Sequence, residues 1–233
     1  MMKKINFAIL NFPGTNCERD CFHVISKVLK QNCKVIWHNE TSISKVDCVV
    51  VPGGFSYGDY LRTGSIASQS RISKALIRFA NQGGSVIGIC NGFQILTELE
   101  LLPGTLIRNT NLKFICKDIN LKVNSNSRFT NLYRSNEVIR IPIAHAEGNY
   151  YADKKILKSL KDNDQIIFSY CNENGDITKK SNPNGSLLNI AGVTNKEGNV
   201  VGLMPHPERV SEKVFNNIDG IRFFKSIINY HNY

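Results

Sequence analysis

The chain has 233 residues, 42% of them hydrophobic, which is enough for one domain of the α/β size range with a substantial buried core. No stretch approaches the roughly 18 apolar residues of a membrane span, and the short apolar run near the N-terminus lacks the cleavage site of a secretory signal. The formal net charge is +10, but the lysines are dispersed and no nucleic-acid-binding motif accompanies them, so we favour a solvated basic surface over a specific anionic partner.

The first half of the chain alternates between strand and helix patterns. Near-continuous apolar runs predict buried strands over residues 5–10, 34–37, 46–51 and 85–89. Helices are expected over roughly 18–30, somewhere between 65 and 81 as a long helix, and from Cys90 to about Leu101. This alternation predicts a parallel sheet that helices cover on both faces.

The pattern changes after Pro103-Gly104, where strands follow one another through turn-rich loops without intervening helices. The strands are expected over residues 114–123, 137–143, 166–170, 187–193 and 200–204. A closing amphipathic helix is expected from about Phe215 to Tyr230. The fold class is therefore α/β, a single domain over residues 1–233 whose mostly parallel central sheet is joined by a smaller antiparallel strand region in the second half.

The cysteines indicate a reducing compartment. There are seven, an odd number, and several lie within apolar runs, which fits free thiols in a cytoplasmic protein better than a disulfide framework. Cys17, Cys21 and His23 invite a zinc interpretation, but their spacing is not a strong ligand pattern and no second cluster completes it. No metal site is therefore expected, and neither a phosphate-binding loop nor a complete dinucleotide fingerprint is present.

Cys90 is the strongest candidate for a catalytic nucleophile. It lies where a buried strand gives way to a helix, within the pattern Gly88-x-Cys90-x-Gly92. This is the layout of a nucleophile elbow with sulfur in place of oxygen, in which small flanking residues let the backbone turn sharply. The N-terminus of the following helix favours negative charge on the sulfur. An inert buried thiol is the alternative, and the paired glycines weigh against it.

His206 and Glu208 are the candidates for the base and its orienting partner. They follow the strand 200–204, at the end of the sheet where open α/β folds bind ligands. Prolines restrict the backbone on both sides of His206, and in an extended segment residues two apart point the same way. Cys90, His206 and Glu208 therefore form a candidate triad. Taken alone, His206 could instead be a histidine in a turn, and Glu208 could be a solvated carboxylate.

Acyl transfer also requires donors for the developing oxyanion. The backbone N–H of Asn91 is one candidate, and that of Gly54 is the second, because Pro52-Gly53-Gly54 ends a neighbouring strand and can approach closely. A simple strand-exit turn at these glycines is equally compatible with the sequence. His145 could line the site or cap a turn, and we favour the first.

The motifs resemble those of the class I (triad) glutamine amidotransferase family, whose fold is flavodoxin-like. The shared segments are Pro52-Gly53-Gly54, Gly88-x-Cys90-x-Gly92-x-Gln94 and His206-Pro207-Glu208. Further segments of similarity run the length of the chain, among them Gly14-Thr-Asn-Cys17, Gly54-Phe-Ser-Tyr-Gly-Asp59, Leu106-x-Arg-Asn109, Asn182-Pro-Asn-Gly-Ser186 and Met204-Pro-His-Pro-Glu-Arg209. Within the family they are similar to the branch that serves as the glutaminase subunit of phosphoribosylformylglycinamidine synthase.

The resemblance implies a glutaminase in purine biosynthesis. Cys90 would form a γ-glutamyl thioester, His206 would move protons under the control of Glu208, and Gly54 and Asn91 would hold the oxyanion. Gly53, Gln94 and His145 would bind glutamine. Ammonia would pass to a separate synthetase subunit, with a small bridging subunit in the complex. ATP and Mg²⁺ would belong to that synthetase, and no cofactor is expected in this chain.

Two positions depart from the family pattern. Ala146 stands where Ala-His-Gly-Glu is expected to have glycine, and Thr63 stands where proline is expected. Neither belongs to the triad, but each could alter a loop near the site. A glutaminase for another synthetase, a free-standing cysteine hydrolase and a catalytically silent regulator remain as alternatives.

Overall fold

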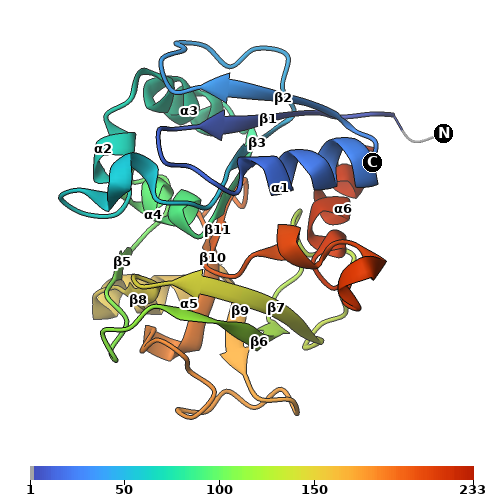
Figure 1. The fold of residues 1–233 in the computed structure, drawn as a ribbon. Helices are drawn as coiled ribbons and strands as arrows, with labels where there is room; N and C mark the ends of the chain where they lie inside the picture. The colour runs from blue at the N-terminus through green and yellow to red at the C-terminus, as the bar shows by residue number, and fades with distance from the viewer. Residues whose placement is uncertain (1–2) are drawn as a thin grey trace.

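The computed structural model describes residues 3–233. Nine of its strands form one sheet in the order β2-β1-β3-β4-β11-β10-β9-β6-β7, and two more pair separately as β5-β8 (Figure 1). The strands are β1 Asn6–Asn11, β2 Asn32–Trp37, β3 Cys48–Val51, β4 Ser85–Ile89, β5 Thr105–Ile107, β6 Ile115–Val123, β7 Val138–His145, β8 Asn149–Tyr151, β9 Ile166–Cys171, β10 Ile190–Thr194 and β11 Val200–Leu203.

Helices connect the strands mainly in the first half of the chain. The α-helices are α1 Glu18–Phe22, α2 Ser65–Ser68, α3 Arg71–Asn81, α4 Asn91–Glu98, α5 Lys154–Asp162 and α6 Ile221–Tyr230. The π-helix η1 His23–Val28 continues α1, and short 3-10 helices are η2 Ser56–Asp59, η3 Leu187–Asn189, η4 Pro207–Val210 and η5 Lys213–Phe215. Within residues 3–233, no helix is long and apolar enough to cross a membrane.

The sheet combines a parallel and an antiparallel half, as the sequence predicted. The strands β2, β1, β3, β4 and β11 pair in parallel. The remaining strands, β10, β9, β6 and β7, extend the same sheet through antiparallel pairs. Only β10 and β6 therefore run against the other strands, and the α/β fold class with a mostly parallel sheet is confirmed.

Helices cover both faces of the parallel half. Figure 1 shows α1 and α6 together on one side of the sheet and α3 and α4 on the other. The central strands are consequently buried on both faces, and every residue of β3 and β4 is buried. This arrangement explains why their sequences are continuous apolar runs rather than alternating patterns.

The long helix expected somewhere between residues 65 and 81 is α3, and the short helix α2 precedes it. Ser70 lies between them in an extended conformation, with φ −65° and ψ 154°. Its hydroxyl forms a hydrogen bond with the Tyr57 hydroxyl at 3.0 Å. Ser70 is the N-cap of α3, and its extended backbone separates the two helices.

The second half differs from its prediction. It contains the helix α5 where only strands and loops were expected, and Asp153 caps it by accepting a hydrogen bond from the Ile156 N–H at 2.7 Å. The closing helix α6 begins at Ile221 rather than near Phe215. The residues before it are bonded to β7 instead, since the Asp219 carboxylate accepts from the Arg140 N–H at 2.8 Å.

Candidate active site

Cys90 lies on a strained turn between β4 and α4. Its backbone has φ 51° and ψ −106°, a conformation that costs a residue with a side chain on the order of 1–3 kcal/mol. A methyl group on Gly88 would lie 2.8 Å from the carbonyl oxygen of Gly92, and one on Gly92 would lie 1.8 Å from that of Val51. The glycines on either side of Cys90 are therefore required by space, and the elbow geometry predicted from the sequence is present.

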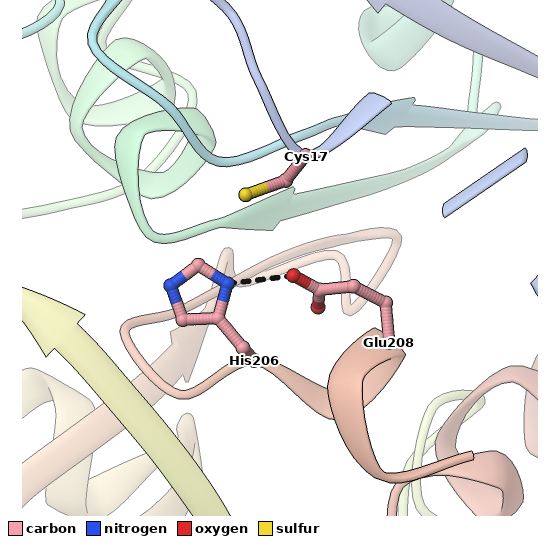
Figure 2. A group of neighbouring side chains, drawn as sticks. All are labelled: Cys17, His206 and Glu208. Carbon is pink, nitrogen blue, oxygen red and sulfur yellow. Dashed lines mark hydrogen bonds and ion pairs between the residues drawn. The ribbon is translucent and has the colours of Figure 1, made fainter. Parts of the chain in front are cut away.

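His206 and Glu208 form a buried pair immediately after β11. His206 Nδ1 and Glu208 Oε1 are 2.6 Å apart, and both side chains are excluded from solvent (Figure 2). The segment is not extended as predicted, because η4 begins at Pro207, but the turn still brings the carboxylate to the ring. Burial lowers the pKa of His206, yet the Glu208 carboxylate and the Cys90 sulfur outweigh it and raise that pKa well above its usual value.

The histidine and the cysteine converge on Gly53. A methyl group built there would lie 2.8 Å from His206 Cε1, which is too close, and 3.4 Å from Cys90 Cβ, which is an ordinary contact, so both side chains border this glycine and His206 requires it. His206 Nε2, the ring nitrogen not bonded to Glu208, is buried and has no hydrogen-bond partner among the described residues. The three residues of the candidate triad therefore meet in one place, although β4 and β11 lie far apart in the sequence.

Asn91 joins the elbow to the loop that follows β3. Its side-chain oxygen accepts a hydrogen bond from the Ser56 N–H at 3.1 Å, and its side-chain amide donates to Gln94 Oε1 at 2.9 Å. Gly54, two residues before Ser56, has φ 146°, which favours glycine. The two backbone segments that carry the candidate oxyanion donors are thus held in a fixed relation to each other.

A small cavity of about 70 Å³ opens beside the sulfur of Cys90. Its lining residues are Gly54, Phe55, Asp59, Thr63, Cys90, Gln94, Ala144, His145, Ala146 and Glu147. Of the sequence-predicted substrate residues, Gln94 and His145 line the cavity, whereas Gly53 does not line it and instead borders His206 and Cys90. The Gln94 amide also donates to the carbonyl oxygen of Glu147 at 2.6 Å, which ties the cavity wall to α4.

The tautomer of His145 follows from its neighbours. Asn109 Oδ1 accepts a hydrogen bond from the Gly148 N–H at 3.1 Å, while Asn109 Nδ2 donates to the carbonyl oxygens of Lys113 and His145. Because this amide orientation makes Oδ1 an acceptor, His145 Nδ1 at 3.1 Å must be the donor. Burial, assisted by the nearby His206, lowers the pKa of His145 to about 4, so the ring is neutral and Nε2 carries a lone pair.

Both positions that depart from the family pattern lie on the cavity wall. The Thr63 hydroxyl donates to Glu147 Oε2 at 3.0 Å, a bond that proline could not make. The carbonyl oxygen of Ala146 accepts from the Asn109 N–H at 2.9 Å. The loop that carries Thr63 is therefore anchored to the neighbouring wall.

The Cys17 sulfur lies beside two residues of the candidate triad, His206 and Glu208. His23, grouped with Cys17 by sequence spacing, is instead bonded to Glu212 at 2.7 Å. Among residues 3–233, the only group of three potential metal ligands is Cys17, His206 and Glu208, whose atoms lie within 4.8 Å of one another (Figure 2). His206 and Glu208 already bond to each other, and Arg209 Nη2 donates to Cys17 Sγ at 3.3 Å. All three residues therefore already have hydrogen-bond partners within the protein.

Comparison with known proteins gives matches along nearly the whole chain. Residues 4–230 match the family model of the CobB/CobQ-like glutamine amidotransferase domain. The phosphoribosylformylglycinamidine synthase subunit PurQ of Moorella thermoacetica is 52% identical over 97% of this chain and 96% of its own. The PurQ subunit of Synechocystis is 54% identical over 95% of this chain and 99% of its own.

A solved structure matches as well. A chain in the structure of PurLQS from Thermotoga maritima superposes with a TM-score of 0.87 and 38% identity, covering 98% of this chain and all of the other. A more distant match, a glutamine amidotransferase of Thermotoga maritima, has a TM-score of 0.59 at 14% identity over 98% of this chain and 83% of its own, and it shares the fold.

Proposed function

The chain belongs to the PurQ family of glutamine amidotransferase subunits, and we propose that it is the glutaminase subunit of phosphoribosylformylglycinamidine synthase. The observation that carries the proposal is the pairing of His206 with Glu208 beside Cys90 on its strained elbow, in a chain about half identical to PurQ subunits. The reaction is the hydrolysis of L-glutamine to glutamate and ammonia.

In the proposed mechanism Cys90 Sγ attacks the carboxamide carbon of glutamine. His206 accepts the thiol proton and delivers it to the departing nitrogen, so that ammonia leaves and a γ-glutamyl thioester remains. His206 then removes a proton from water, which attacks the thioester and releases glutamate and the free thiol. Glu208 orients the imidazole and stabilises its charged form, a role that the 2.6 Å contact supports.

Two backbone N–H groups, those of Gly54 and Asn91, would stabilise the oxyanion in both steps. Gln94 would shape the substrate cavity from α4, and Gly53 would leave room for the His206 ring beside Cys90. His145 would use its Nε2 lone pair to accept an N–H of the carboxamide. That acceptor favours an amide over a carboxylate, whose oxygen would meet the lone pair with repulsion.

Ammonia requires an acceptor reaction outside this chain. We assign it to a PurL-type synthetase subunit, which converts formylglycinamide ribonucleotide to formylglycinamidine ribonucleotide, with a PurS-type small subunit in the complex. The structural match to a chain of PurLQS supports this assignment. ATP and Mg²⁺ are expected on the synthetase subunit, and the complex is expected to work in the cytoplasm.

Ammonia release from L-glutamine by the reconstituted complex tests the proposal. The wild-type chain and Cys90→Ser are compared with and without the synthetase and small subunits, and formation of formylglycinamidine ribonucleotide is followed in parallel. We expect Cys90→Ser to lose about 10³-fold or more of the glutaminase rate, because it removes the nucleophile.

The outcomes separate the alternatives. Equal rates for wild type and Cys90→Ser would rule out the thioester mechanism. Full glutaminase activity of the isolated chain, unchanged by the partners, would indicate a free-standing hydrolase. Ammonia release without any formylglycinamidine ribonucleotide would point to a different synthetase.

A further inference from the structure

Asp59 places an unpaired carboxylate in the cavity beside Cys90. It lies at the end of η2 and lines the same small space as the nucleophile. Among residues 3–233 no Lys, Arg or His side chain forms an ion pair with it, and its one side-chain hydrogen bond, from Asn91 Nδ2, is long at 3.5 Å. Burial, reinforced by the charge of Glu147, raises the pKa of Asp59 to about 6.

Glu147 adds a second carboxylate to the same cavity. Its position is fixed, because its backbone oxygen accepts from Gln94 and its side chain accepts from Thr63. Arg108 approaches Glu147 Oε1 at 3.6 Å, but the arginine side chain is 78% exposed, so this ion pair is weak. Among the described residues, this weak ion pair is the only one to either carboxylate, so their negative charge is incompletely balanced.

A third acceptor lines the cavity at His145. The residue is only 3% exposed, and its Nε2 has no hydrogen-bond partner among the described residues. It follows Ala144, whose carbonyl oxygen lies 3.7 Å from Cys90 Sγ, so the histidine belongs to the nucleophile's end of the cavity. A ligand that satisfies these acceptors must bring N–H donors, and one of its donor groups should be positively charged.

We propose that Asp59, assisted by Glu147, binds the α-ammonium group of the substrate amino acid and thereby selects a free α-amino acid. The inference rests on the proposed glutaminase function. Glutamine carries an ammonium group at one end and a carboxamide at the other, which matches two carboxylates and a neutral histidine acceptor. Asp59 is then a substrate-binding residue that sets KM, whereas the chemistry stays with Cys90 and His206.

The test uses glutaramate, the analogue of glutamine that lacks only the α-amino group. Rates for glutamine and glutaramate are measured with the reconstituted complex containing wild type, Asp59→Asn or the control Glu173→Gln, an exposed carboxylate far along the chain. We expect Asp59→Asn to raise KM for glutamine about 10- to 100-fold with little change in kcat, the range for loss of a charged hydrogen bond. Its activity toward glutaramate should stay at the wild-type level.

Other results would overturn the inference. If Asp59→Asn loses activity toward both substrates in parallel, the substitution acts on the loop through Asn91 instead. If the variant matches wild type for both substrates, Asp59 does not bind the ammonium group. Binding of glutamine and glutaramate to Cys90→Ala and to Cys90→Ala with Asp59→Asn, measured by calorimetry, applies the same comparison without turnover. If wild type binds glutamine selectively but releases no ammonia, the proposed function fails while the ammonium site stands.

Discussion

Cys90 differs from most of the other cysteines in its surroundings. Burial raises the pKa of Cys33 to about 12 and that of Cys171 to about 11, and it raises the pKa of Cys21 well above its usual value. Cys90 lies instead at the N-terminus of α4, beside an imidazole whose pKa is raised. We therefore expect iodoacetamide to modify Cys90 ahead of the other six cysteines, as measured by peptide mapping after limited labelling.

The histidine provides the control for this labelling. Replacing His206 by Asn removes the neighbouring positive charge, and we expect it to slow modification of Cys90 about tenfold while leaving the exposed Cys116 unchanged. Preferential labelling of Cys17 or Cys116 in the wild-type protein would contradict the assignment of the nucleophile.

The carboxyl of Asp59 should destabilise the unliganded protein near neutral pH. Its pKa is about 6 in the folded state against an ordinary value of 3.8, so the fold favours the protonated form. The resulting penalty is absent below about pH 4 and develops fully as the pH rises through 6. Because the residue is partly exposed, we expect Asp59→Asn to gain only about 1 kcal/mol at pH 8.

Urea unfolding at pH 8 and at pH 4.5 measures this effect. The advantage of Asp59→Asn over wild type should shrink at the lower pH, whereas the Glu173→Gln control should match wild type at both. Asparagine also tolerates the positive φ of 55° at this position, so the backbone is not the source of the difference. A gain that is independent of pH would show that the charge is not its cause.

The contact between α4 and β3 is what fixes the nucleophile in space. Gly92 lies in the first turn of α4, where its backbone packs against Val51 at the end of β3. Gly92→Ala forces these elements apart, and we expect it to cost about 3 kcal/mol in urea unfolding and to abolish most glutaminase activity. Gly198→Ala is the control, because its methyl meets nothing within 4 Å and only the positive φ of 68° opposes it, for about 1 kcal/mol. Equal costs for the two variants would contradict close packing as the cause.

The elbow could be predicted from the sequence because its constraint is local. Gly88 and Gly92 flank Cys90 at fixed spacing, and the structure gives both glycines the steric role that the spacing predicts. The helix α5 had a local signal as well, since Asp153 precedes the apolar residues Ile156, Leu157 and Leu160, but the surrounding strand patterns obscured it. Asp59 belongs to the shared segment Gly54-Phe-Ser-Tyr-Gly-Asp59, but the role proposed for it could not be predicted, because it depends on Glu147, which only the folded chain brings to the same cavity.

The arrangement of the whole sheet was predicted only in outline. The apolar runs indicated which segments are strands, but strand order depends on pairings between distant parts of the chain. The pairing of β4 with β11 joins Val86 to Val200, and no local pattern marks it. The His206–Glu208 pair was predicted from its place after a strand, whereas its meeting with Cys90 depends on this long-range pairing.

The place of β11 in the sheet has a consequence for synthesis of the protein. The strand nearest the C-terminus lies in the middle of the nine-stranded sheet, between β4 and β10. Until β11 and the segment that carries His206 have been synthesised and have joined the sheet, β4 and β10 each lack a neighbouring strand and no imidazole lies beside Cys90, so the nascent chain cannot hydrolyse glutamine. Activity therefore arises in one late step, when this strand inserts, and a prematurely terminated chain is both inactive and prone to aggregate through its unpaired edges.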